Sequence, residues 1–138
     1  MMQQDLHPAI RAHLASIAAA ESGDKTSWLA LFAEEAWVQD PVGPSPYDPS
    51  GLGFRGKEAI EGFWDHVIGP SETTFESRLR VPSGLDSCAC WMVARNRIGV
   101  QHIDIDVMVT YELDNDGKIA TLRAFWDFDA VMSAITGS

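Results

Sequence analysis

The chain has 138 residues, 46% of them hydrophobic and 22% charged, which is the composition of a globular protein rather than of a disordered segment. Its formal charge of −10 would repel nucleic-acid backbones and anionic membranes, so neither is an expected partner. No apolar run is long enough to span a membrane and no signal pattern opens the chain, so we expect a single cytoplasmic domain over residues 1–138.

The first helix is predicted from Pro8 to Glu21. Apolar residues recur there every three or four positions, Pro8 suits a first helical turn, and Gly23 suits the end of a helix. His13 and Ser16 lie three positions apart and therefore share one flank of this helix. They are either polar residues at the edge of the core or catalytic groups, and the helical pattern alone favours the first.

A second helix is predicted to begin after Asp24, whose side chain suits an N-cap. Trp28, Leu31 and Phe32 form its expected buried stripe. This helix is predicted to lead directly into a short strand.

That strand is predicted to end at Asp40, because Pro41 has no backbone N–H to donate to a neighbouring strand. Side chains alternate along a strand, so Asp40 shares the apolar face of Val38. A carboxylate on an apolar face is costly unless it is paired, hydrated or functional. Asp40 is therefore the first candidate for a catalytic group.

Residues 41–53 are rich in Pro and Gly and are predicted to form a loop over the mouth of a cavity. A third helix is predicted to start near Lys57, with Trp64 beside its apolar stripe. After Pro70 the period of the pattern changes from that of helices to that of strands. The predicted strands are residues 75–81, 87–97, 100–113 and 118–128.

Two further patterns were weighed as metal sites. Cys88 and Cys90 point the same way from a strand, but two ligands do not close a zinc site, so core packing is favoured. His102, Asp104 and Asp106 share a strand face and form either a metal site or a solvated, subunit-facing surface. The second interpretation is favoured, and we expect no metal and no cofactor.

Three segments carry a resemblance to a known family: VQDP at 38–41, FRGKEAIEGFW at 54–64 and RAFW at 123–126. On these segments the chain resembles the ketosteroid isomerase and SnoaL-like branch of the nuclear transport factor 2-like superfamily. The resemblance implies an α+β fold in which three N-terminal helices pack into a curved, mainly antiparallel sheet. The result is a cone with one deep apolar pocket, usually as a homodimer.

The resemblance also implies roles for individual residues. The isomerase base falls on Asp40, while the two donors that stabilise the enolate oxygen, a tyrosine and a protonated aspartic acid, fall on Ser16 and Val109. The tyrosines that support those donors fall on Phe32 and Trp64. The complete set of implied pocket residues is Phe32, Val38, Trp64, Met92, Val109, Leu122, Ala124 and Trp126.

Replacing a donor tyrosine by Ser16 weakens the predicted enolate stabilisation. His13 is a candidate replacement donor; acting as a cation, it would make activity fall as pH rises through its pKa, about 6.5 when unperturbed.

Two classes of function follow from these observations. The first is an enzyme in which Asp40 moves a proton on a hydrophobic, steroid-like small molecule, as a steroid Δ-isomerase does, with weak turnover of standard substrates. Polyketide cyclase or hydratase chemistry would use the same base. The second is a non-catalytic binding module, and a polar donor near Asp40 would discriminate between the two. In either case we expect a homodimer formed through the outer sheet face, where Arg123 could alternate with the acidic residues.

Overall fold

A computed structural model describes residues 7–136 of the chain. Residues 1–6 and 137–138 lie outside the described residues. The expectation that no signal pattern opens the chain falls in part on residues 1–6. The helices and strands are α2 (Pro8–Ser22), α3 (Lys25–Ala30), β1 (Phe32–Gln39), β2 (Phe54–Arg55), α4 (Lys57–Phe63), η1 (Trp64–Ile68), β3 (Glu72–Ser83), β4 (Ser87–Ile98), β5 (Gln101–Leu113), β6 (Ile119–Phe125) and α5 (Phe128–Thr136).

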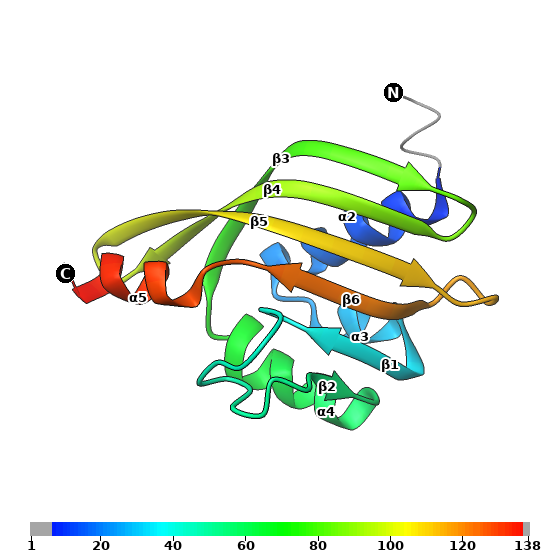
Figure 1. The fold of residues 1–138 in the computed structure, drawn as a ribbon, viewed down its shortest axis with the longest axis horizontal. Coiled ribbons are helices and arrows are strands. Elements are labelled where there is room, and N and C mark those ends of the chain that lie inside the picture. The colour runs from blue at the N-terminus through cyan, green and yellow to red at the C-terminus, as the bar shows by residue number, and fades with distance from the viewer. Residues whose placement is uncertain (1–6, 137–138) are drawn as a thin grey trace.

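The six strands form one curved sheet in the order β2-β1-β6-β5-β4-β3 (Figure 1). Of the pairings among these strands, β1 with β6 is parallel and the others are antiparallel. In the view of Figure 1, α2 and α3 lie behind the long strands, and α5 follows β6 at the left. The predicted α+β class, with helices packed into a curved and mainly antiparallel sheet, is confirmed.

Helix α2 has a defined start and end. The Ala9 backbone N–H donates to Nδ1 of His7 at 3.1 Å, which satisfies one of the unpaired donors of the first turn. Gly23 ends the helix at a φ of 71°, where a residue with a Cβ would be strained. The helix lies against the sheet and buries Ile10 and His13 completely.

The predicted second helix is shorter than expected, and placing Phe32 in it was wrong. Helix α3 ends at Ala30, and Phe32 is already the first residue of β1. The Ile119 N–H donates to the Leu31 carbonyl at 2.8 Å, so pairing with β6 starts immediately after the helix. Tertiary pairing has overridden a local helical pattern here, although Phe32 is buried as expected.

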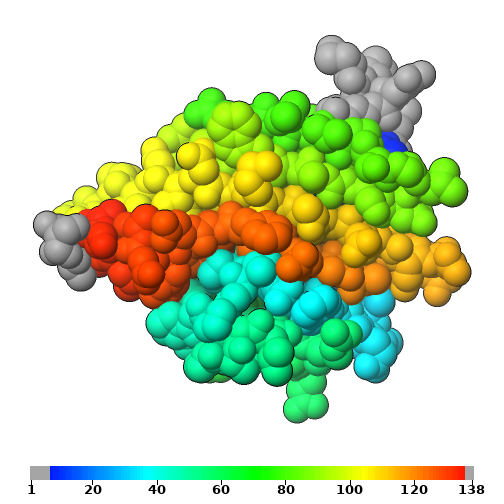
Figure 2. Space-filling view, viewed as in Figure 1, coloured from blue at the N-terminus to red at the C-terminus, as the bar shows by residue number. Residues whose placement is uncertain are grey.

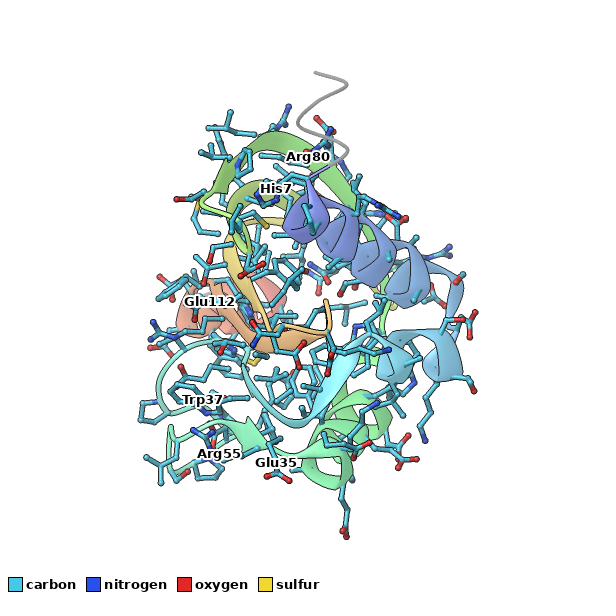
Figure 3. The ribbon with its side chains drawn as sticks, turned by 90° about the vertical axis from the view of Figure 1, so that its right-hand side faces the viewer. His7, Glu35, Trp37, Arg55, Arg80 and Glu112 are labelled. Atoms are coloured by element: carbon cyan, nitrogen blue, oxygen red, sulfur yellow. The ribbon has the colours of Figure 1, made fainter. Side chains whose placement is uncertain are left out.

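Strand β3 contains a β-bulge that the sequence pattern does not reveal. Ser77 pairs with Met92, but Leu79 pairs with Trp91, so Arg78 is an extra residue in the ladder. The bulge reverses the alternation beyond it, and Leu79 is 54% exposed. Arg80 therefore turns to the helix side of the sheet; Figure 3 shows it on β3 near the N-terminal end of α2.

The last predicted strand, residues 118–128, was too long. Strand β6 ends at Phe125, and α5 begins three residues later. The Ala130 N–H donates to Oδ1 of Asp127 at 3.0 Å, so Asp127 caps the first turn of α5. Among the described residues, no helix is both long and apolar enough to cross a membrane.

The loop between β1 and β2 covers the outer side of β1. Trp37 donates from Nε1 to the Leu52 carbonyl at 2.7 Å, and the guanidinium of Arg55 lies 4.9 Å from the centre of the Trp37 ring (Figure 3). Gly53 is required at this contact, since a Cβ there would lie 2.4 Å from Nε1 of Trp37. The loop is therefore held in place and does not hang free from the sheet.

Candidate functional site

A cavity of about 780 Å³ opens on the helix side of the sheet. This volume lies in the ordinary range for pockets that enclose a drug-sized molecule. The predicted residues that line it are Ser16, Asp40, Met92, Val109, Leu122, Ala124 and Trp126. The predicted residues that are buried but do not line it are His13, Phe32, Val38 and Trp64.

Asp40 follows the last residue of β1, and Trp126 follows the last residue of β6, its parallel neighbour. The two side chains meet in the cavity, where Nε1–H of Trp126 donates to Oδ1 of Asp40 at 2.6 Å. Burial raises the pKa of Asp40 to about 6, and the hydrogen bond from Trp126 offsets part of that rise. Part of Asp40 stays accessible through the cavity, so the carboxylate can meet a ligand.

A carboxylate with a pKa of about 6 suits a general base near neutral pH. It is ionised at pH 7, and it holds an abstracted proton more readily than an exposed aspartate does.

Two buried hydroxyl groups, those of Ser16 and Tyr111, line the same cavity. Ser16 lies on α2, and its Oγ accepts from Nε1–H of Trp28 at 3.2 Å. Tyr111 lies on β5, two positions beyond Val109 and on the same face, and its hydroxyl contacts Nδ1 of His13 at 3.2 Å. Burial raises the pKa of Tyr111 far above its usual value, and a hydrogen bond from Ser16 offsets part of that rise. Tyr111 therefore keeps its proton and can donate it in a hydrogen bond.

Sequence reasoning missed Tyr111 as a site residue. The alternation along residues 100–113 did place it on the inward face, together with Val109. The resemblance directed attention only to the position of Val109, where the isomerases carry a donor. A donor moved by two positions along one strand face would have been found by examining that whole face.

His13 lies behind the cavity wall, fully buried against Tyr111. Burial first, and then the positive charge of Arg80, lower the pKa of His13 to about 4. The ring is therefore neutral at pH 7, and the hypothesis that His13 acts as a cationic donor near neutral pH is wrong. The pKa of His13 is lowered because burial removes solvent from the ring and because the β-bulge turns the positively charged Arg80 inward.

Helix α5 and the segment η1 complete the wall around the apolar part of the cavity. Helix α5 contributes Phe128, Val131, Met132 and Ile135, at the spacing of one helical face. Tyr47 of the β1–β2 loop meets Phe128 edge to face, with ring centres 5.5 Å apart. Segment η1 has π-helical geometry, which is frequent at functional sites.

The residues weighed as metal ligands are engaged elsewhere. Asp104 accepts from Arg95 at 2.6 Å, and Asp106 accepts from Trp91 at 2.9 Å. Cys88 and Cys90 are buried with their sulfurs 3.9 Å apart. Across residues 7–136, no group of three or more His, Cys, Asp or Glu side chains is placed to hold a metal ion.

An α+β fold in which helices pack against a curved, mainly antiparallel sheet with a cavity between them is the arrangement of the nuclear transport factor 2-like superfamily. Residues 10–122 match the model of the SnoaL-like domain, so the chain belongs to the SnoaL-like family.

Three named proteins are similar to this chain. The steroid Δ-isomerase of Nocardioides simplex is 29% identical over 127 residues, which cover 91% of this chain and 92% of that protein. The crystal structure of the Δ5-3-ketosteroid isomerase from Mycobacterium sp. superposes with a TM-score of 0.83 at 32% identity, covering 91% of this chain and 97% of that one. RV0760c of Mycobacterium tuberculosis, solved with estradiol-17β-hemisuccinate, gives a TM-score of 0.83 at 30% identity, covering 89% and 96%.

Proposed function

We propose that the protein binds a hydrophobic polycyclic or steroid-like ketone and that Asp40 transfers a proton beside the carbonyl group, as in a steroid Δ-isomerase. The observation that carries this proposal is the contact of Asp40 with Trp126 inside a mostly apolar cavity, where the pKa of Asp40 rises to about 6. The names of two relatives, an isomerase and a steroid complex, support the class of ligand.

The reaction needs three things: a base, an apolar slot and a group that stabilises the enolate oxygen. Asp40 removes a proton from the carbon next to the carbonyl, and the electron pair moves to the carbonyl oxygen. Protonated Asp40 then returns the proton to a different carbon of the conjugated system. The base is unchanged at the end, so no cofactor takes part in these steps.

The rate depends on the donors. Removing one donor from an oxyanion site typically costs about 2.7–4 kcal/mol, or roughly a hundred- to thousandfold in rate. Among the hydroxyl residues that line this cavity, Ser16 and Tyr111 are the buried ones, and both are neutral. Because Ser16 is short, the proposed turnover of standard steroid enones is slow.

Two alternatives remain within the same fold. A polyketide cyclase or hydratase would use the same carboxylate on a different carbon acid. A non-catalytic binding module would use the cavity alone. The hydroxyl of Tyr111 on the cavity wall favours the enzyme, because a donor in the same cavity as Asp40 is what proton transfer requires and simple apolar binding does not.

We also propose a homodimer through the outer face of the sheet, which Figure 2 shows uncovered across β3, β4, β5 and β6. The acidic residues expected to alternate across the interface are paired within the chain, as is Arg123, which donates to Gln39 at 2.8 Å. The apolar row that crosses this face consists of Leu79, Trp91, Met108 and Phe125, each paired with the next and each at least 40% exposed. A second copy, related by a twofold axis, covers such a row with the same row.

The test is a titration with a 3-ketosteroid, monitored by the intrinsic tryptophan fluorescence of the protein, followed by an isomerisation assay. Saturable binding with turnover that Asp40→Asn abolishes supports the enzyme. Saturable binding without turnover in the wild-type protein supports the binding module instead.

A further inference from the structure

Ser16 and Tyr111, two of the hydroxyl residues that line the cavity, differ in the groups that contact them from behind. An indole N–H only donates, so Ser16 accepts from Trp28 and gives its own hydroxyl hydrogen to the oxygen of Tyr111. Tyr111 meets Nδ1 of His13 at 3.2 Å, and an imidazole nitrogen either donates or accepts. The proton on His13 therefore decides what Tyr111 can do.

A neutral imidazole carries one N–H, on either of its two nitrogens. With the proton on Nε2, the lone pair of Nδ1 takes the hydroxyl hydrogen of Tyr111, which then has none for a ligand. With the proton on Nδ1, the ring donates to the oxygen of Tyr111, and the hydroxyl hydrogen is free to turn into the cavity. The oxygen of Tyr111 then accepts from both His13 and Ser16, and its hydroxyl hydrogen is the group left for a carbonyl oxygen of a ligand.

Burial distinguishes between the two arrangements. Nε2 of His13 is buried and has no hydrogen-bond partner among the described residues. A buried N–H without an acceptor loses its hydrogen bond to water, whereas an unused acceptor is the less rare defect in folded proteins. A second ring proton is opposed by burial and by Arg80, which acts on the ring from β3, while Tyr111 faces it from β5. The single proton is thus favoured on Nδ1.

We propose that His13 is a positioning residue that carries its proton on Nδ1 and so directs the hydroxyl hydrogen of Tyr111 toward a ligand oxygen. The position of the proton is independent of any reaction. The choice of a ketone as ligand rests on the proposed function. This donor makes the cavity selective for a ligand with an acceptor oxygen over the same skeleton without one.

The position of the proton is measured directly by long-range ¹H–¹⁵N correlation NMR on the wild-type protein labelled at histidine. The chain has four histidines, and the His7→Gln, His66→Asn and His102→Asn variants assign the His13 signals by elimination. We expect Nδ1 of His13 to be protonated and Nε2 to show the signal of a bare lone pair. A protonated Nε2 with a bare Nδ1 would overturn the proposal.

A binding experiment tests the consequence for the ligand. The probes are androst-4-en-3-one and its 3-deoxy analogue, and the variants are His13→Phe and Tyr111→Phe. We expect the wild type to prefer the ketone and Tyr111→Phe to lose ~10-fold in ketone affinity, as for one hydrogen bond. His13→Phe should weaken ketone binding by a smaller factor and leave the analogue unchanged.

The opposite arrangement, with the proton on Nε2, predicts the opposite change in ketone affinity for His13→Phe. If His13 accepted from Tyr111, its removal would release the hydroxyl hydrogen, and ketone affinity would rise. Equal wild-type affinity for the two probes would also overturn the role of Tyr111 as a donor to the ligand. Turnover that survives Asp40→Asn would remove the proposed function while leaving both of these readouts intact, so the two failures are distinguishable.

Discussion

The hydrogen bond from Trp126 to Asp40 sets how much of the base is ionised, and Trp126→Phe removes it while keeping an aromatic ring in the cavity. A hydrogen bond to a charged group contributes roughly 1.5–3 kcal/mol, which corresponds to about 1–2 pKa units. The pKa of Asp40 is about 6 in the intact protein. In the variant we expect a pKa of roughly 7–8, because the carboxylate loses its donor and keeps its burial.

The assay is the pH dependence of kcat/KM for a 3-ketosteroid, which reports the pKa of the base in the free enzyme. Activity falls below the pKa as Asp40 gains a proton, so the acid limb should move up by about 1–2 units. The matched control is Phe128→Leu, which removes the ring next to Trp126, 5.9 Å away, and keeps the donor. An acid limb that stays in place in Trp126→Phe would refute the reasoning.

Three further predictions follow from the same geometry. The pKa of Asp40 is about 6 in the folded state against 3.8 for an unperturbed aspartate, so the stability of the folded state falls as pH rises between these values. Urea unfolding should therefore show Asp40→Asn more stable than wild type above pH 6, by up to about 3 kcal/mol, and a wild type of equal stability would contradict this. Tyr111→Phe should lower kcat by roughly a hundredfold or more with the far-ultraviolet spectrum intact, and unchanged kcat would remove Tyr111 from the donors. Met108→Arg should give a monomer in light scattering while Leu85→Arg, in the exposed β3–β4 turn, stays dimeric; a monomeric wild type would end the dimer proposal.

The strand faces were accessible to sequence reasoning because alternation holds wherever the ladder is regular. Strands β4 and β5 pair residue for residue without a shift, and Met92 and Val109 both reach the cavity. Asp40 was identified because proline fixes where its strand ends. The same rule failed in β3, where one extra residue, Arg78, reversed the faces beyond it, and no local signal in the sequence marks that bulge.

Helix α5 could have been predicted from the sequence, but it was missed. Asp127 is a good N-cap, and Phe128, Val131, Met132 and Ile135 follow at helical spacing. Extending the preceding strand through Asp127 concealed both signals. The oversight matters because α5 lines the cavity.

Depth within the core could not be predicted. Alternation indicates which residues face inward, but it does not separate those on the cavity wall from those behind it. Val38 and Trp64 face inward and are almost fully buried, yet neither lines the cavity. That distinction depends on how the helices fill the concave side of the sheet, which is a property of the whole packing.

The most direct test of the account is turnover of androst-5-ene-3,17-dione by the wild type and by Asp40→Asn, with the rise in absorbance of the conjugated enone as the signal. We predict slow but measurable isomerisation by the wild type, with an acid limb near the pKa of Asp40, about 6, and none by the variant. Efficient isomerisation by Asp40→Asn would contradict the account, because the base would then lie elsewhere.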